Sequence, residues 1–443
     1  MIKNKEFARR RRDLMAMMEK NSIAIVTAAP ERVRSRDTYF PYRQDSDFHY
    51  LSGFPEPEAV LVLIPGRAHG EFVLFCRDRD RDREIWDGYR AGPTGACKDY
   101  GADDAFPITD IDEILPGLLE GRERVYYAVG KDRDFDQSLM DWVNDIRGRA
   151  RSGAVPPGEF IDLDHLLHEM RLFKKPAELT LMRKASRISA AAHCRAMKTA
   201  RSGISEYHLQ AEIEHQFAMD GASFPAYSSI VGGGKNACVL HYVVNDSVLK
   251  DGDLVLIDAG CEYHHYAADI TRTFPVNGIF TSAQKAIYEL VLNAQLAAID
   301  VVQAGRHWDE PHQVTIEVIT AGLVDLGLLK GNVSKLIDKG AYRDFYMHRA
   351  GHWLGMDVHD VGDYKVDNEW RLLEPGMVMT VEPGIYIAPD NTKVAKKWRG
   401  IGIRIEDDVL ITRKGPEVLT AGVPKTIADI EALMAKGQGA KTA

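Results

Sequence analysis

Apolar runs that end or begin at a carboxylate constrain the fold of this chain most strongly. Asp258 closes the run LVLIDAG, and Asp269 opens DITRTF after a short polar connection. We therefore expect two paired strands on which Asp258 and Asp269 face each other across a hairpin. Cross-strand neighbours lie ~5 Å apart at their Cβ atoms, and like charges at that spacing repel unless a cation lies between them. The pattern predicts a bound dication, which would reverse this penalty.

Two further carboxylates follow strand-like runs in the same half of the chain. Glu382 ends the apolar run MVMTV directly before Pro383, where burial is costly unless the carboxylate is paired or binds a metal. Glu406 follows Arg404 by two residues in GIGIRIEDD and shares a strand face with it. For this pair alone, an ion pair on a solvated strand is an equally good interpretation.

One histidine completes the candidate site. His352 lies in HRAGHWLGMDVHD between Gly351 and Gly355, which would let backbone approach a buried centre. Alone it is more often a satisfied core group than a ligand. With the four carboxylates it gives an oxygen-rich set that favours Mn²⁺ and also admits Co²⁺ or Zn²⁺. The ligand count implies two ions, and no HExxH motif of a mononuclear zinc site is present.

Length and composition predict a two-domain enzyme. At 443 residues the chain exceeds the usual size of one hydrophobic core. We expect an α+β chain, with a smaller α/β domain over residues 1–174 and a larger domain over 175–440 that packs helices on an antiparallel sheet. The net charge of −9 argues against a nucleic-acid partner, and no apolar stretch is long enough to cross a membrane. Five cysteines without a CxxC pair favour reduced thiols in the cytoplasm.

An arginine run near the N-terminus, residues 9–12, is predicted to be neither an export signal nor a nucleic-acid arm. Acidic residues interrupt the segment after it, while Phe7, Leu14 and Met18 recur at helical spacing. We interpret the run as the solvated face of a first helix.

Several long strings resemble one known family. They are GDLVLIDAGCEYHHYAADITRTFPVNG, HWLGMDVHDVG, LEPGMVMTVEPGIYIAP and RGIGIRIEDDVLIT, with RSRDTYFPYRQDSDFHYLSGFPEPEAVLVL and EIWDGYRAG in the first half. In this order they resemble the M24 metallopeptidases of pita-bread fold, and within them the aminopeptidase P branch. The resemblance implies a C-terminal pita-bread domain behind a smaller N-terminal domain. It also implies an exopeptidase that cleaves the N-terminal Xaa-Pro bond with a hydroxide bridging two metal ions.

The resemblance also implies roles for single residues. Asp258 and Asp269 would hold one ion, with Asp269 and Glu406 bridging to the second, and His352 and Glu382 would complete the pair. Glu382 would serve as general base as well. His241 and His359 would contact the scissile carbonyl region, His348 would line the pocket, and Arg404 would hold a bridging carboxylate. Contacts to substrate are expected from Tyr386, Arg371, Trp86 and Asp37.

Two departures from the family pattern affect the expected pocket rim. The connection between the two aspartates contains the pair His264 and His265, and Arg349 stands where a small residue is expected.

Two other functions stay open at this point. The first is a prolidase restricted to Xaa-Pro dipeptides, with organophosphate hydrolysis as a side activity. The second is a pita-bread binding module without catalysis. The resemblance further implies a homo-oligomer, either a tetramer or a dimer.

Overall fold

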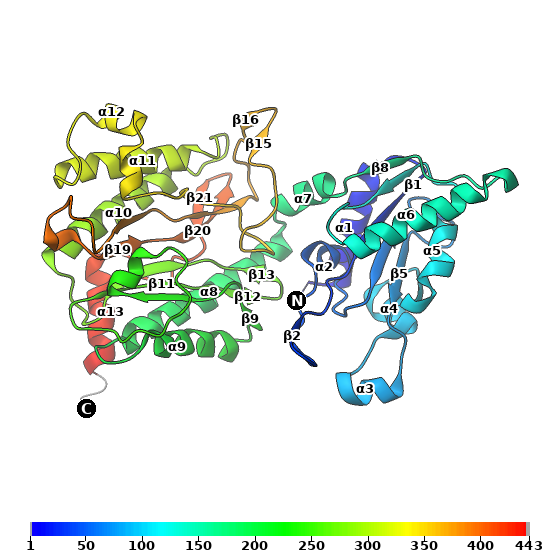
Figure 1. Ribbon diagram of the computed structural model, residues 1–443, viewed down its shortest axis with the longest axis horizontal. Coiled ribbons are helices and arrows are strands. Elements are labelled where there is room, and N and C mark those ends of the chain that lie inside the picture. Colours follow the sequence, from blue (N-terminus) through cyan, green and yellow to red (C-terminus); the bar gives the residue numbers. More distant parts are fainter. Residues whose placement is uncertain (1, 440–443) are drawn as a thin grey trace. The chain divides into compact units, whose positions relative to one another are not determined.

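The computed structural model describes residues 2–439 and divides into two compact units, Met1–Met170 and Arg171–Ala443 (Figure 1). The division falls within helix α7 (Asp164–Leu172). The predicted domain boundary, near Lys174, lies slightly further along the chain.

The first unit is built on one mixed sheet of six strands in the order β6-β5-β4-β1-β7-β8. Strand β1 pairs antiparallel with β4 and parallel with β7. On one face, Ile23, Val62 and Phe75 pack with α5 and α6 in a single apolar core. The strands are β1 (Ser22–Thr27), β4 (Val60–Leu63), β5 (Phe72–Cys76), β6 (Asp104–Pro107), β7 (Arg124–Tyr126) and β8 (Glu159–Ile161), with a separate pair β2 (Val33–Ser35) and β3 (Thr38–Tyr39). The helices before α7 are α1 (Asn4–Met17), α2 (Ser46–Ser52), α3 (Arg81–Asp87), α4 (Gly92–Tyr100), α5 (Ile111–Leu119) and α6 (Arg133–Gly148).

Two arginines of the run at residues 9–12 are buried, which corrects the prediction of a solvated face. Arg10 is fully buried, donates from Nη1 to the carbonyl of Tyr50 and lies over that ring. Arg11 donates to the carbonyl of Leu51 and lies over Phe72. Their guanidinium groups satisfy carbonyls near the end of α2, which local sequence periodicity does not reveal.

The second unit places its strands between two sets of helices, with α8 and α9 on one side and α10 and α11 on the other (Figure 1). Helix α8 begins at Pro176, where the missing amide hydrogen is tolerated, and Glu178 caps it by accepting from the Lys175 amide. The helices are α8 (Pro176–Thr199), α9 (Glu206–Met219), α10 (Ser282–Asp300), α11 (Glu310–Asp325), α12 (Val333–Asp338) and α13 (Ile427–Gly439).

Short antiparallel sheets make up the strand layer of the second unit. Their orders are β10-β11-β14, β13-β12-β9, β17-β20-β21, β18-β19 and β15-β16. The strands are β9 (Phe224–Pro225), β10 (Ile230–Gly233), β11 (Leu254–Asp258), β12 (Cys261–Tyr263), β13 (Tyr266–Ala267), β14 (Thr271–Pro275), β15 (Lys365–Val366), β16 (Glu369–Trp370), β17 (Val378–Val381), β18 (Gly384–Ile387), β19 (Ile401–Arg404), β20 (Asp407–Thr412) and β21 (Gly415–Val418).

The predicted pairing of the two aspartate-bearing runs is present, but in a different register. Strands β11 and β14 are antiparallel, and the residue opposite Asp258 is Thr271. Asp269 precedes β14, and the connection forms its own small hairpin of β12 and β13. His264 and His265, both at positive φ, make the turn of that hairpin.

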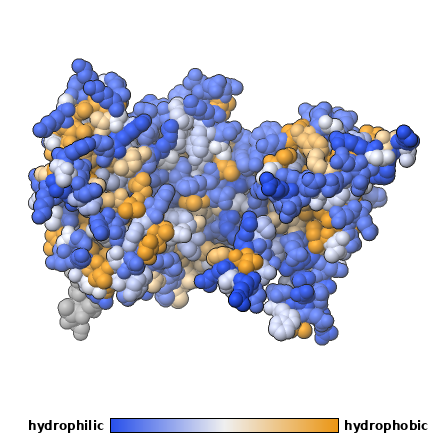
Figure 2. All heavy atoms as spheres, viewed as in Figure 1, coloured by the Kyte–Doolittle hydropathy of each residue, from blue (hydrophilic) through white to orange (hydrophobic). Residues whose placement is uncertain are grey.

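The surface lacks a large apolar patch on the face drawn in Figure 2, where hydrophobic residues form small separate groups among hydrophilic ones. Within residues 2–439, no helix combines the length and apolar character needed to cross a bilayer.

Candidate metal centre

A cavity of about 490 Å³ in the second unit brings together side chains from distant parts of the sequence. All five predicted metal ligands line it, as do three further histidines and two arginines. The titratable lining residues are Tyr227, His241, Asp258, Asp269, His348, Arg349, His352, His359, Glu382, Arg404 and Glu406. Within this set, ligand atoms of Asp269, His352 and Glu406 lie within 4.8 Å of one another.

Tyr227 links the two aspartates. Its hydroxyl lies 2.6 Å from Oδ1 of Asp258 and 2.5 Å from Oδ1 of Asp269. Burial and the adjacent carboxylates raise the pKa of Tyr227 well above its ordinary value, so the phenol stays protonated and donates. Sequence reasoning missed this residue, because a tyrosine in the segment FPAYSSIV has no charge or spacing that indicates a site.

The backbone around His352 runs beside β17. The amide of Thr380 donates to the His352 carbonyl, and the amide of Glu382 donates to the Ala350 carbonyl. Gly351 is required at this approach, because a Cβ there would lie 2.0 Å from the Thr380 carbonyl oxygen. The pairing places the His352 and Glu382 side chains in the same cavity.

The hydrogen bonds of His352 leave one ring nitrogen suited to a cation. Nδ1 lies 2.9 Å from the Trp353 carbonyl oxygen, which can only accept, so Nδ1 holds the proton of the neutral ring. Nε2 faces Oδ2 of Asp269 at 3.4 Å and Oε1 of Glu382 at 3.6 Å. Although burial opposes it, these two carboxylates raise the pKa of His352 to about 9, so without a metal Nε2 carries a proton as well. A bound cation would take the place of that proton between the two carboxylates, and metal-binding histidines have a hydrogen bond like that of Nδ1 at their other ring nitrogen.

The pKa values of the carboxylates show that placing these groups close together without a cation is unfavourable. Burial, reinforced by the neighbouring acids, raises the pKa of Glu406 well above its ordinary value. Burial also raises the pKa of Asp258, and that of Glu382 to about 7. Asp269 is the exception, because the hydrogen bond and charge of His352 outweigh burial and lower its pKa.

This donor set fits divalent metal ions. Asp258, Asp269 and Glu406 have side chains buried among like charges, and the oxygen-rich chemistry matches hard dications. A bound dication would remove the repulsion that raises these pKa values.

Arg404 is buried and its guanidinium contacts three groups. Nη2 lies 2.5 Å from Oδ2 of Asp258, Nε donates to Thr271 Oγ1 at 3.0 Å, and Nη1 donates to the Tyr386 hydroxyl at 3.1 Å. Thr271 in turn donates to Oε2 of Glu406 at 2.6 Å. Arg404 therefore bonds Asp258 directly and reaches the predicted bridging carboxylate, Glu406, through Thr271. The solvated ion pair considered for Arg404 and Glu406 is wrong, because both residues are buried.

Three predicted histidines lie at different depths of the cavity. His348 is held by the Arg349 carbonyl at Nδ1 and by the Tyr386 hydroxyl at Nε2, 2.9 Å away. Burial lowers the pKa of His348 to about 3, so its ring is neutral. His359 is exposed and packs edge-on against His352, with ring centroids 4.4 Å apart. His241 is exposed and lines the same cavity.

Other predicted contact residues are not among the residues that line the cavity. Tyr386 is buried behind it and joins His348 to Arg404. Arg371 lies over the Phe173 ring. Trp86, on α3, and Asp37, between β2 and β3, are exposed residues of the first unit, and their substrate contacts stay predictions.

Behind the cavity lies a buried charge cluster that sequence reasoning also missed. Asp407 accepts from Arg272 at 2.7 Å and from Lys425 at 2.8 Å. Although burial opposes it, these two cations hold the pKa of Asp407 well below its ordinary value. Asp408 accepts from the backbone amide of Asp269. The cluster therefore fixes the backbone at two candidate ligands, Glu406, which precedes Asp407, and Asp269, whose amide Asp408 accepts from.

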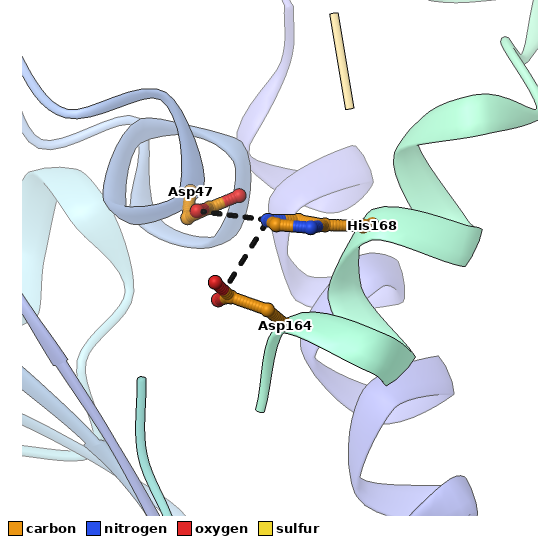
Figure 3. A group of neighbouring side chains, drawn as sticks. All are labelled: Asp47, Asp164 and His168. Carbon is orange, nitrogen blue, oxygen red and sulfur yellow. Dashed lines mark ion pairs between the residues drawn. The ribbon is translucent and has the colours of Figure 1, made fainter. Parts of the chain in front are cut away.

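A second group with metal-ligand chemistry lies in the first unit (Figure 3). Nε2 of His168 is 3.6 Å from a carboxylate oxygen of both Asp47 and Asp164. Lys131 already places its ammonium 3.1 Å from Asp47 and 2.9 Å from Asp45. A protein cation therefore neutralises this group, and we interpret it as an ion-pair network.

Comparison with known proteins agrees with this geometry. Residues 180–413 match the model "Metallopeptidase family M24", and residues 7–126 match "Aminopeptidase P, N-terminal domain". The chain is 50% identical to the Xaa-Pro aminopeptidase of Escherichia coli (strain K12), over 98% of each sequence.

Solved structures extend this likeness to the fold. The Pseudomonas aeruginosa aminopeptidase PepP superposes with a TM-score of 0.98 at 67% identity over 99% of both chains. Escherichia coli aminopeptidase P with the inhibitor Pro-Leu superposes with a TM-score of 0.96 at 49% identity, also over 99% of both chains. These comparisons confirm the predicted fold class, a pita-bread domain behind a smaller α/β domain.

Proposed function

The chain belongs to metallopeptidase family M24, and we propose that it hydrolyses the bond between an N-terminal residue and a following proline, using two divalent ions. The observation that carries this proposal is the convergence of Asp258, Asp269, His352, Glu382 and Glu406 on one cavity. When bound, the ions would supply an activated water and polarise the peptide carbonyl. Similarity to Xaa-Pro aminopeptidases over 98% of the chain supports the substrate class.

Glu382 is the proposed general base. Its pKa of about 7, raised by burial, matches a group that accepts and returns a proton near neutral pH. Thr380 Oγ1 donates to one of its oxygens at 3.4 Å, and Nε2 of His352 lies 3.6 Å from the same oxygen.

His241 and His359 are the proposed donors to the carbonyl and amide groups of the scissile bond. Both rings are exposed on the cavity lining, where substrate can reach them. Arg404, Tyr386 and His348 form a hydrogen-bonded chain that positions Asp258 and closes one wall. A peptide bond to proline lacks an amide hydrogen, so this pocket needs no acceptor for one.

We further propose Mn²⁺ as the resident metal, on the hardness of an oxygen-rich donor set. A zinc-substituted form is among the solved Escherichia coli aminopeptidase P structures, so that relative also accepts Zn²⁺.

Cytoplasmic location and a homo-oligomer, dimer or tetramer, stay predictions. The five cysteines are free in the structure.

A peptide panel tests the proposal. The Mn²⁺-loaded protein should release the first residue from Ala-Pro-Ala-Ala and should leave Ala-Ala-Ala-Ala largely intact. Strong preference for the dipeptide Ala-Pro over the tetrapeptide would instead identify a prolidase. If the protein neither cleaves these peptides nor binds metal, it is a binding module. The convergence of all five proposed ligands on one cavity argues against that alternative.

A further inference from the structure

Arg349 is a cavity-lining cation to which the proposed reaction assigns no role. Its backbone carbonyl lies 2.7 Å from Nδ1 of His348, and its guanidinium group lies over rings of an aromatic cluster. The guanidinium carbon lies 4.8 Å from the ring centroid of Trp370 and 5.6 Å from that of Trp308. Cation–π contact with two indole rings restricts the guanidinium group and leaves its N–H groups able to donate.

The aromatic cluster that supports Arg349 is itself well fixed. Trp308 is buried and packs edge-on against Tyr364 at 4.5 Å, and Tyr364 stacks on Trp353. Trp353 follows the proposed ligand His352 in the chain. The cluster therefore holds Arg349 in a set position relative to the metal centre.

Among residues 2–439, Arg349 has no ion-pair partner. The cavity's other arginine, Arg404, is bonded to Asp258. Across the described part of the chain, Arg349 has no carboxylate within ion-pair distance. Lys365 lies over the Trp370 ring as well, at 4.6 Å, so a second cation adds to the positive field near Arg349. The pKa of His312 is lowered to about 4 by burial and by the nearby Arg349.

We propose that Arg349 selects peptides by binding a carboxylate on the part of the substrate beyond the proline. This inference rests on the proposed function. The substrate's positive amino terminus lies before the scissile bond, so a cation on the cavity lining favours a negative group on the other side of that bond, further along the peptide. A guanidinium fork that is already ordered binds a carboxylate through two parallel hydrogen bonds. The carboxylate is either the free C-terminus of a short peptide or an acidic side chain.

Two pairs of peptides distinguish these sources. Ala-Pro-Ala is compared with its C-terminal amide, and Ala-Pro-Glu-amide is compared with Ala-Pro-Gln-amide. The wild-type protein should cleave at least one charged peptide with a kcat/KM roughly tenfold above its neutral partner. The pair that shows the preference identifies the source. The preference should weaken at high salt, because the pair is partly exposed.

Variants assign the preference to Arg349. R349M should abolish it while leaving cleavage of the neutral peptides within about twofold of wild type, and R349K should retain part of it. K397M is the matched control, because Lys397 also lies over a tryptophan ring, that of Trp398, but does not line the cavity. It should keep the full preference.

Two results would overturn the inference. A wild-type protein that cleaves all four peptides equally, or an R349M variant that keeps the preference, excludes it while the proposed function stands. Failure of the Mn²⁺-loaded protein to cleave any of the four overturns the proposed function and this inference with it.

Discussion

Nη2 of Arg404 lies 2.5 Å from Oδ2 of Asp258, and this contact joins the candidate metal centre to the hydrogen-bonded wall of its cavity. Lysine in place of Arg404 keeps the charge but cannot bond Asp258, Thr271 and Tyr386 together. We expect Arg404→Lys to lower metal affinity or kcat roughly 10- to 100-fold. Steady-state kinetics across a Mn²⁺ titration measure both. Arg413→Lys, outside the cavity, is the control, and unchanged kinetics in Arg404→Lys would refute the assigned role.

Glu382→Gln should lower kcat about 10²- to 10⁴-fold while the protein still folds, because glutamine cannot accept the proton. Peptide cleavage and a thermal melt check the two parts. Near-normal turnover in this variant would remove Glu382 from the proposed base role.

The same variant gives a pH test on metal-free protein. The pKa of Glu382 rises on folding from 4.5 to about 7, so its stabilising contribution is full below 4.5 and is lost as the pH rises through 7. The melting temperature of wild type minus that of Glu382→Gln should therefore fall between about pH 5 and about pH 8. Glu289→Gln, at an exposed site on α10, is the control for the effect of the substitution itself. A difference that is constant with pH would contradict the raised pKa.

His359→Ala and His352→Ala should separate chemistry from metal binding. Nε2 of His352 faces Asp269 and Glu382, whereas His359 packs against the His352 ring from the cavity side. His352→Ala should lose bound metal, and His359→Ala should retain it with a lower kcat. Elemental analysis of both purified variants provides the measurement. Metal loss in His359→Ala would make that residue a ligand.

Asp360 follows His359 and is buried between two cations, Arg171 at 2.6 Å and Lys174 at 2.9 Å. Asp360→Asn leaves these buried charges undercompensated, so we expect a loss of about 3–5 kcal/mol in the free energy of unfolding. Glu417→Gln breaks an exposed pair with Arg183 and should cost about 0–1 kcal/mol. Denaturant unfolding compares the two, and equal losses would show that burial of the Asp360 network is unimportant.

Sequence patterns were most informative where a charge interrupts an apolar strand. Asp258 and Glu382 end such strands, and burial makes an unpaired carboxylate there costly, so a shared site was predictable. The α+β class followed from the change between helical and strand periodicity along the chain.

Contacts between distant segments were not predictable from local pattern. The register that places Thr271, rather than Asp269, opposite Asp258 depends on the inserted hairpin of β12 and β13. Tyr227 reaches both aspartates through tertiary packing alone. Arg10 is buried over Tyr50, although its sequence neighbours indicate a solvated helix face.

Stoichiometric metal reconstitution tests the central claim most directly. Chelator-treated protein should be inactive toward Ala-Pro-Ala-Ala, and activity should return as Mn²⁺ is added, with a calorimetric end point of two ions per chain. Full activity in the metal-free protein, or an Asp269→Asn variant that binds and responds to Mn²⁺ as wild type does, would contradict the account.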